Sequence, residues 1–265
     1  MNQFTALVFN TIQKEIRRKS LIFALAFTVI VILLSIFLVG ALKDMVSEYS
    51  EVPLLSNEAY IYLIFMVITS WNSILGFIMG SDLVKSDEKL KISPLILSFP
   101  ISRNFYLLSR IFGAWLLIGI YYVFSLILAV SLYYFSMGEI SASPLVFVAL
   151  IFSSLTTLAA ITLGALFSTF MPNFFSIMSS FIMFVIITIA NSMKFDSFDG
   201  EAWKYVIWRG IDLIFPPVGN LSKVTTQTLS KSFEAKESFM TLGHFSLTFV
   251  GLYLIFFFIY KKKSF

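Results

Sequence analysis

Residues 140–193 read ISASPLVFVALIFSSLTTLAAITLGALFSTFMPNFFSIMSSFIMFVIITIANSM and contain no charged side chain. A helix rises about 1.5 Å per residue, so roughly 20 residues cross a hydrocarbon core of about 30 Å. The stretch is long enough for two crossings, and the Met-Pro-Asn sequence at 171–173, near its centre, favours a turn. We therefore expect two transmembrane helices, at 145–170 and 174–193.

The rest of the chain has the same character. It is 265 residues long, 58% hydrophobic and only 13% charged, with a mean hydropathy of +0.89. A soluble domain would carry about 25% charged residues, so a water-soluble fold is excluded. The apolar runs do not alternate with polar residues as barrel strands do, which favours helices. The sequence predicts a single all-α membrane domain over 1–265 with six spans, at about 20–42, 59–81, 105–135, 145–170, 174–193 and 239–260.

The distribution of basic residues predicts the orientation. With six crossings and a cytoplasmic N-terminus, 12 of the 19 lysines and arginines lie on the cytoplasmic side. Both termini are therefore expected in the cytoplasm, in a multi-pass protein of the cell membrane. The first apolar run is too long for a signal-peptide core and is expected to stay as an anchor. The absence of cysteine excludes disulfides and thiolate metal sites.

Residues 3–19 are predicted to form an amphipathic helix on the cytoplasmic membrane surface, where it would contact lipids. A surface anchor and a functional role are both open for it. Its apolar face consists of Phe4, Leu7, Val8, Ile12 and Ile16. Its polar face consists of Gln3, Asn10, Lys14, Arg17 and Arg18.

Two further segments are predicted to carry short helices. Between spans two and three, Ser93 followed by Pro94 can begin a helix that Pro100 ends. The apolar face of that helix has too few local neighbours to be buried, so it either dips into the bilayer or occupies a groove on another protein. The longest hydrophilic segment, 194–237, is expected on the outer side, with an interfacial helix that ends before the prolines at 216 and 217.

Motifs for chemistry are missing. The chain has no P-loop sequence and no zinc-protease or serine-hydrolase motif, and a role for its single histidine, His244, is not indicated because it has no sequence partner. The uncharged spans also lack the ionisable relay that an ion-coupled carrier uses. We expect no enzymatic activity, no metal site and no cofactor bound by this chain.

Small residues predict where spans pack. Gly76 and Gly80 form a GxxxG motif in the second span, and Ala160, Gly164 and Ser168 repeat the spacing in the fourth. A contact within the chain is favoured over a dimer interface. Asn72, near the middle of the second span, is expected to bond across helices or to line a cavity, with the first favoured.

Residues 82–113, DLVKSDEKLKISPLILSFPISRNFYLLSRIFG, resemble the segment between the second and third spans of type-2 ABC exporter permeases. The shared features are an acidic stretch, a leucine-rich helix, a Pro-hydrophobic-Ser-Arg turn at 100–103 and the basic Arg110. The chain departs from the family at 91–94, where Lys-Ile-Ser-Pro replaces a common Gly-Thr pair. The basic N-terminal helix, the six spans and the long outer segment extend the resemblance over nearly the whole chain.

The resemblance implies a permease that pairs with a second copy or a paralogue and binds two ATPase subunits, which would hold ATP and Mg²⁺. The loop between spans two and three would dock into the ATPase together with the N-terminal helix. Its apolar side chains would fill a groove and its charged ones would form a polar rim. The expected docking residues are Asp87, Glu88, Leu95, Ile96, Leu97, Phe99 and Arg103.

The resemblance leaves the cargo open between hydrophobic or lipid-like compounds and force transmission in metalloenzyme assembly, because the nitrous oxide reductase maturation permease belongs to the same broad family. By the same resemblance, segment 194–237 would form an outer cap or re-entrant helices that gate exit. Alternatives from other classes are a membrane-embedded lipid-modifying enzyme, a secondary carrier and a scaffold without transport. An enzyme would need clustered reactive groups, whereas Glu48, Glu51 and Glu58 read as a solvated loop. No nucleic acid partner is expected.

Overall fold

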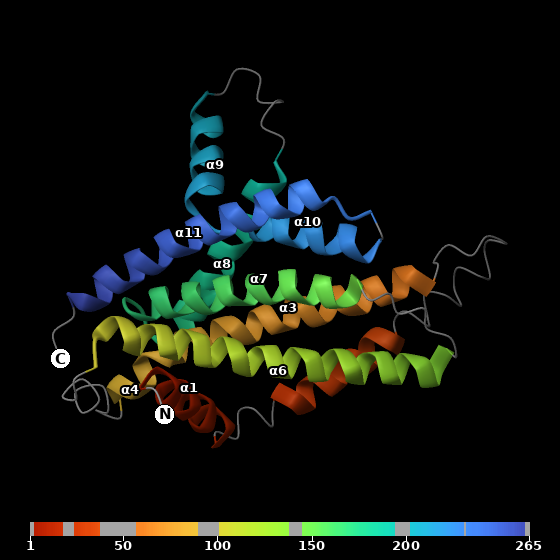
Figure 1. Ribbon diagram of the computed structural model, residues 1–265, viewed down its shortest axis with the longest axis horizontal. Coiled ribbons are helices and arrows are strands. Elements are labelled where there is room, and N and C mark those ends of the chain that lie inside the picture. The colour runs from red at the N-terminus through yellow and green to blue at the C-terminus, as the bar shows by residue number, and fades with distance from the viewer. Residues whose placement is uncertain are drawn as a thin grey trace.

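The computed structural model describes residues 3–17, 24–37, 57–89, 101–137, 145–193, 202–230 and 232–262. Within these ranges all regular secondary structure is helical, and the long helices run side by side along the longest dimension of the molecule (Figure 1). The labelled helices are α1 (Gln3–Arg17), α3 (Asn57–Leu83), α4 (Lys85–Lys89), α6 (Arg103–Met137), α7 (Leu145–Ser168), α8 (Asn173–Ser192), α9 (Ala202–Ile214), α10 (Val218–Leu229) and α11 (Ala235–Lys261).

Among the described residues, five helical segments are long and apolar enough to cross a membrane, namely Phe65–Lys89, Arg103–Leu132, Val146–Ser168, Asn173–Ser192 and Ala235–Lys261. They correspond to the second to sixth predicted spans and have the architecture of a multi-pass membrane protein. For the first predicted span, 20–42, the structure describes only the shorter apolar helix Ala24–Phe37. Six crossings therefore stay a prediction.

The turn predicted at residues 171–173 is confirmed. The helix α7 ends at Ser168 and α8 begins at Asn173. The connection is closed by backbone bonds such as Phe170 N–H to the carbonyl of Phe167, at 3.1 Å. The hydroxyl of Ser176 also donates to the carbonyl of Gly164 at 3.0 Å, so the two helices are held together directly beside their turn.

Glycines allow α3 and α7 to pack with their backbones in close approach. A Cβ atom added to Gly80 would overlap the carbonyl oxygen of Ile161, and one added to Gly164 would lie 2.8 Å from the carbonyl oxygen of Phe77. At Gly76 the added atom would lie 3.1 Å from the Cβ of Ala160. The small residues of the second and fourth predicted spans thus meet each other within the chain. The sequence favoured such a contact over a dimer interface.

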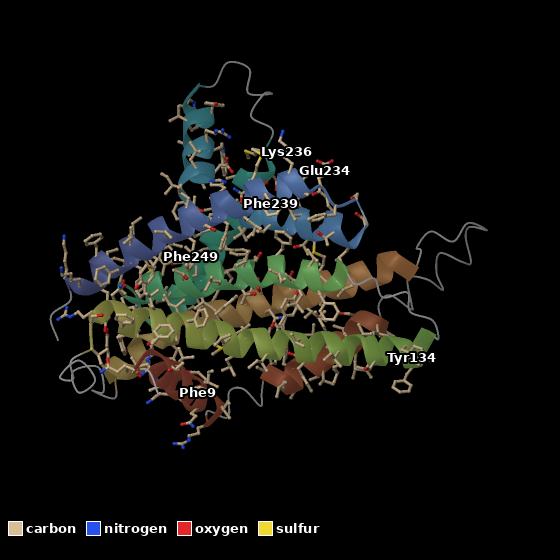
Figure 2. All side chains as sticks on the ribbon, viewed as in Figure 1. Phe9, Tyr134, Glu234, Lys236, Phe239 and Phe249 are labelled. Carbon is tan, nitrogen blue, oxygen red and sulfur yellow. The ribbon has the colours of Figure 1, made fainter. Side chains whose placement is uncertain are left out.

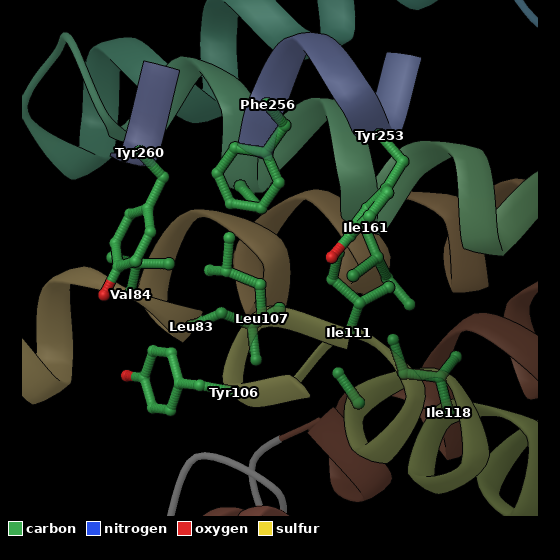
Figure 3. Close-up of a cluster of buried hydrophobic side chains, with 12 residues drawn as sticks. Leu83, Val84, Tyr106, Leu107, Ile111, Ile118, Ile161, Tyr253, Phe256 and Tyr260 are labelled. Atoms are coloured by element: carbon green, nitrogen blue, oxygen red, sulfur yellow. The ribbon is translucent and has the colours of Figure 1, made fainter. Parts of the chain in front are cut away.

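Apolar side chains also cover much of the outer surface. Phe135 and Leu247 are 83% and 75% exposed, and Phe9 and Phe239, both labelled in Figure 2, are exposed as well. A water-soluble monomer rarely exposes so much apolar surface, whereas lipid-facing helices require it. Inside, one buried cluster joins α3, α6, α7 and α11, with the rings of Tyr106 and Tyr260 facing each other (Figure 3).

The helices α9 and α10, between α8 and α11, differ in their packing. The helix α9 points away from the bundle in Figure 1, and its Trp203 is exposed. It ends before the two prolines, as predicted, and Pro217 precedes the first residue of α10. The sequence did not predict α10, which lies along α7 and α8 with Leu221 and Val224 in their buried cluster.

Candidate functional site

The carboxylate of Asp87 is the centre of a buried polar network at the end of the bundle that holds α1 and α4. Its side chain is 0% exposed. The ammonium of Lys14, in α1, donates to its Oδ1 at 2.5 Å. On the other oxygen, the phenol of Tyr106 donates at 2.6 Å and the guanidinium of Arg110 forms a second ion pair. One carboxylate therefore joins α1, α4 and α6.

Local sequence explains how these groups meet. A turn at Val84 ends α3, and the amide of Glu88 bonds back to the carbonyl of Val84 at 3.1 Å, which forms α4. Tyr106 and Arg110 are four residues apart in α6, so they share one face of that helix. The guanidinium carbon of Arg110 also lies 5.5 Å from the ring centre of Tyr106, within the range of a cation–π contact.

The helix α1 packs directly against α6 beside this network. The guanidinium of Arg110 donates to the hydroxyl of Thr11 at 2.9 Å, and that hydroxyl donates in turn to the carbonyl of Leu7 at 2.9 Å. A Cβ atom added to Gly113 would lie 2.8 Å from the Cβ of Thr11. Contact this close requires a glycine, so α6 has a flat surface for α1 at this position.

The start of α6 is also fixed to the end of α11. Arg103 donates to the carbonyl of Lys261 at 2.9 Å, and the phenol of Tyr253 bonds to Asn104. The carbonyls of the last turn of a helix have no partner within the helix, and a positively charged donor there also interacts favourably with the helix dipole. The described residues on the two sides of 90–100 are therefore fixed to other helices, α4 through Asp87 and the start of α6 through Arg103.

The sequence-predicted docking residues have different positions in the structure. Asp87 is buried and paired inside the chain, so the expectation that it lies on a polar rim is wrong. Arg103 contacts α11, and the side chain of Glu88 is partly exposed. The four apolar docking residues lie outside the described residues: Leu95, Ile96, Leu97 and Phe99.

The helix predicted at the N-terminus is confirmed, but its polar face differs from the prediction at Lys14. Lys14 was placed on the solvated face, whereas its side chain is only 17% exposed because it pairs with Asp87. Ile16 is predicted on the apolar face and is exposed, as a side chain that contacts lipid would be. Arg17 is exposed, and Arg18 lies outside the described residues. Hydrophobic spacing alone could not reveal that a buried carboxylate 73 positions later attracts Lys14.

A second feature is a cavity of about 330 Å³ between α3, α7, α8 and α10. Among the described residues, its lining contains no ionisable side chain and combines hydroxyl groups with apolar residues. The lining residues are Met66, Thr69, Ser70, Ser73, Ile74, Phe77, Ser153, Thr156, Phe181, Phe184, Val185, Thr188, Ile189, Val218, Ser222 and Thr225.

The cavity was not predicted from the sequence because its four walls come from segments far apart in the chain. Serine and threonine spaced three or four positions apart in the second, fourth and fifth spans were the available signal. Asn72 was the polar residue singled out instead. It is fully buried, and its amide donates to the carbonyl of Ile68 in its own helix at 2.9 Å. In the described part of the chain its Oδ1 has no partner, so the expected bond across helices is not formed.

A third polar cluster joins α8, α9 and α10. The amide nitrogen of Asn191 donates to Asp212 at 2.8 Å, and its oxygen accepts the backbone N–H of Gly219 at 3.0 Å. Arg209 pairs with the other oxygen of Asp212 at 3.3 Å. Across the ranges that the structure covers, no three His, Cys, Asp or Glu side chains lie close enough together to hold a metal ion.

No protein family, curated protein or solved structure matches the chain. The features that bear on function are therefore the buried network around Asp87, the cavity and the resemblance of residues 82–113.

Proposed function

We propose that this chain is the membrane-spanning permease subunit of an ATP-driven transporter of the type-2 ABC exporter class. Separate ATPase subunits would dock at the end of the bundle that holds α1 and α4. The observation that carries the proposal is the buried carboxylate of Asp87, which joins α1, α4 and α6 next to the segment that resembles the coupling loop of this class.

The network supports a role in force transmission. Removing one partner of a buried ion pair leaves a charge without compensation, so such a pair holds its elements in one geometry more than it stabilises them. The helix α4, before residues 90–100, is bonded to α1 and α6 through Asp87, and Arg103, after them, is bonded to α11. A motor that moves this segment would therefore move α1, α4 and the start of α6 together.

The connection from this network to the cavity is short. The helix α4 follows α3 after one turn residue, and α3 forms a wall of the cavity. Close packing of α3 on α7 through Gly76, Gly80 and Gly164 makes these two helices respond together. Movement of α4 would thus reach the cavity through packed backbones, without the need for a flexible linker.

The lining of the cavity supports an external source of energy. None of its residues is ionisable, so the cavity has no site where a coupling proton or sodium ion would bind a charged group. The same lining suits uncharged, largely apolar cargo. Exposed aromatic residues near the start of α8, Phe174 and Phe175, offer a surface for a second copy or a paralogue that would complete the transport path.

Affinity purification tests this proposal. The tagged chain is purified in mild detergent from the membranes of the cell that produces it. We expect a protein with a P-loop sequence to co-purify and the complex to hydrolyse ATP. The double variant Leu95→Asp with Phe99→Asp should lose both, whereas the control Phe233→Asp, in the connection between α10 and α11, should keep them. A chain that purifies without an ATPase, or a double variant that retains one, contradicts the proposal.

A further inference from the structure

The cavity between α3, α7, α8 and α10 is divided into a hydroxyl-rich part and an aromatic part. On α3, Thr69 and Ser73 come before Phe77, so the hydroxyls lie further from the α7–α8 turn than the ring does. On α8, which runs in the opposite direction, Phe184 comes before Thr188. Both helices therefore place their hydroxyls away from that turn.

Ring contacts and backbone packing fix this register. The ring of Phe77 lies 5.3 Å from that of Phe184 and 6.3 Å from that of Phe181, each edge to face, which forms one aromatic end of the cavity. The carbonyl of Phe77 also packs against Gly164 of α7, so Thr156 lies two turns away, towards the hydroxyls of α3. Thr69 and Phe77 are separated by about 12 Å along their helix.

The hydroxyl groups offer hydrogen-bond acceptors. Eight of the sixteen lining residues are serine or threonine, and seven of those eight donate their proton to a carbonyl of their own helix. For example, Thr188 donates to the carbonyl of Phe184 at 2.9 Å and Thr225 to that of Leu221 at 2.8 Å. Each oxygen retains at least one lone pair that can accept a bond from a ligand, although the hydroxyl of Thr69 already shares a 2.5 Å hydrogen bond with the phenol of Tyr122. The hydroxyl part of the cavity thus favours ligands that donate.

Charged head groups are disfavoured. A carboxylate, phosphate or ammonium entering the cavity would lose its hydration and find no ion of opposite charge in the lining. A neutral hydroxyl or amide loses less hydration and regains its hydrogen bonds from the serine and threonine oxygens. The aromatic end contributes only apolar contact.

We propose that this cavity binds an uncharged amphiphile whose head group carries a donating hydroxyl or amide. The head lies among the hydroxyls of α3, α7, α8 and α10, and the hydrocarbon part lies against Phe77, Phe181 and Phe184. The role of this amphiphile as transported cargo rests on the proposed function. Its binding in the cavity does not.

Photo-crosslinking in lipid nanodiscs tests the inference without any ATPase. The probe is a ten-carbon primary alcohol with a diazirine in its chain, and its attachment sites are mapped by peptide mass spectrometry. Decan-1-ol, decyl methyl ether and decanoate at alkaline pH serve as unlabelled competitors, since only the alcohol can donate a hydrogen bond without a charge. We expect adducts on 69–77 of α3 or 181–189 of α8, and competition by the alcohol about fivefold stronger than by the ether, which corresponds to one neutral hydrogen bond. Decanoate should compete least.

Two variants test whether the hydroxyl groups of the cavity recognise the head group. In Ser73→Ala combined with Thr188→Val, the preference for the alcohol over the ether should fall to about equality, while competition by the ether stays unchanged. Ser154→Ala removes an exposed hydroxyl that donates to its own helix on α7, outside the cavity, and should keep the preference.

Adducts confined to other helices, equal competition by alcohol and ether in the unaltered chain, or a preference that survives the double variant would each overturn the inference. Failure to label at all, as expected if a second copy of the chain seals the cavity, would overturn it as well. An ATPase that co-purifies despite these results leaves the proposed function standing.

Discussion

Arg110 of α6 and Asp87 of α4 form an ion pair whose side chains are only 3% and 0% exposed. The pair lies at the end of the bundle, where α6 begins, and Lys14 and Tyr106 complete the surroundings of the carboxylate. One buried carboxylate on α4 thus receives bonds from α1 and α6, which is a strong geometric constraint, since none of the three helices can move away without leaving a charge in an apolar site.

Replacing the carboxylate should therefore destabilise the protein strongly. In Asp87→Asn, Arg110 stays buried beside a neutral amide, and we expect a loss of about 3–5 kcal/mol in the free energy of unfolding, measured by chemical denaturation in detergent. Glu237→Gln breaks the exposed pair with Lys223 and should cost about 1 kcal/mol or less.

A double variant distinguishes the loss of the ion pair from a general disruption of the site. If the two charges interact, Asp87→Asn combined with Arg110→Gln should lose clearly less stability than the sum of the two single variants. Additive losses would mean that the pair is not coupled in the folded protein.

The contact between α3 and α7 should not tolerate a methyl group at Gly80. Because the added Cβ of Gly80→Ala would overlap the backbone of Ile161, the helices must separate, at a cost of about 1–3 kcal/mol. Gly251→Ala, in α11, adds an atom that meets nothing within 4 Å and should be neutral or slightly stabilising. Thermal unfolding of both variants in the same detergent is the measurement, and equal melting temperatures would contradict the packing.

The N-terminal helix should detach when its flat contact surface is filled. In Gly113→Val the branched side chain would collide with Thr11, so α1 should lose protection against amide hydrogen exchange while α7 and α8 keep theirs. Gly119→Ala, on the same helix but in open space, is the control. Unchanged protection of α1 in Gly113→Val would show that it is not held against α6 at this point.

Asn191 should be required to hold α9 and α10 in place. In Asn191→Ala, Asp212 and the backbone N–H of Gly219 both lose a partner, and we expect a loss of about 1–3 kcal/mol together with faster hydrogen exchange in α9 and α10. Ser192→Ala, whose exposed hydroxyl donates only to the carbonyl of Thr188, should change neither quantity. Similar exchange rates in the two variants would contradict this role.

Much of the helical architecture followed from the sequence. Uncharged runs of spanning length, the Met-Pro-Asn turn and the two prolines after Ile214 are local signals, and each predicted a helix or a helix end that the structure contains. The glycine spacing in α3 and α7 was also readable, because two small-residue faces at matching intervals can pack closely.

The buried polar contacts could not be predicted from local sequence signals in the same way. The resemblance implies that Asp87 lies on the polar rim of a docking loop, and only the fold brings Lys14 and Arg110 to it from positions 73 residues earlier and 23 residues later. Likewise, the cavity needs four helices to be arranged in space. The helix α10 was hidden because its sequence, rich in serine and threonine, has neither the length nor the hydropathy of a span.

The central claim is that an ATPase binds beside Asp87, and cysteine cross-linking tests it most directly. Because the chain contains no cysteine, Lys89→Cys, exposed at the end of α4, and Glu234→Cys, exposed before α11, each carry a single reactive thiol. With a thiol-directed photo-crosslinker applied to native membranes, we expect Lys89→Cys to be linked to a protein with a P-loop sequence and Glu234→Cys not to be. No such adduct at Lys89→Cys, or equal adducts at both positions, would contradict the account.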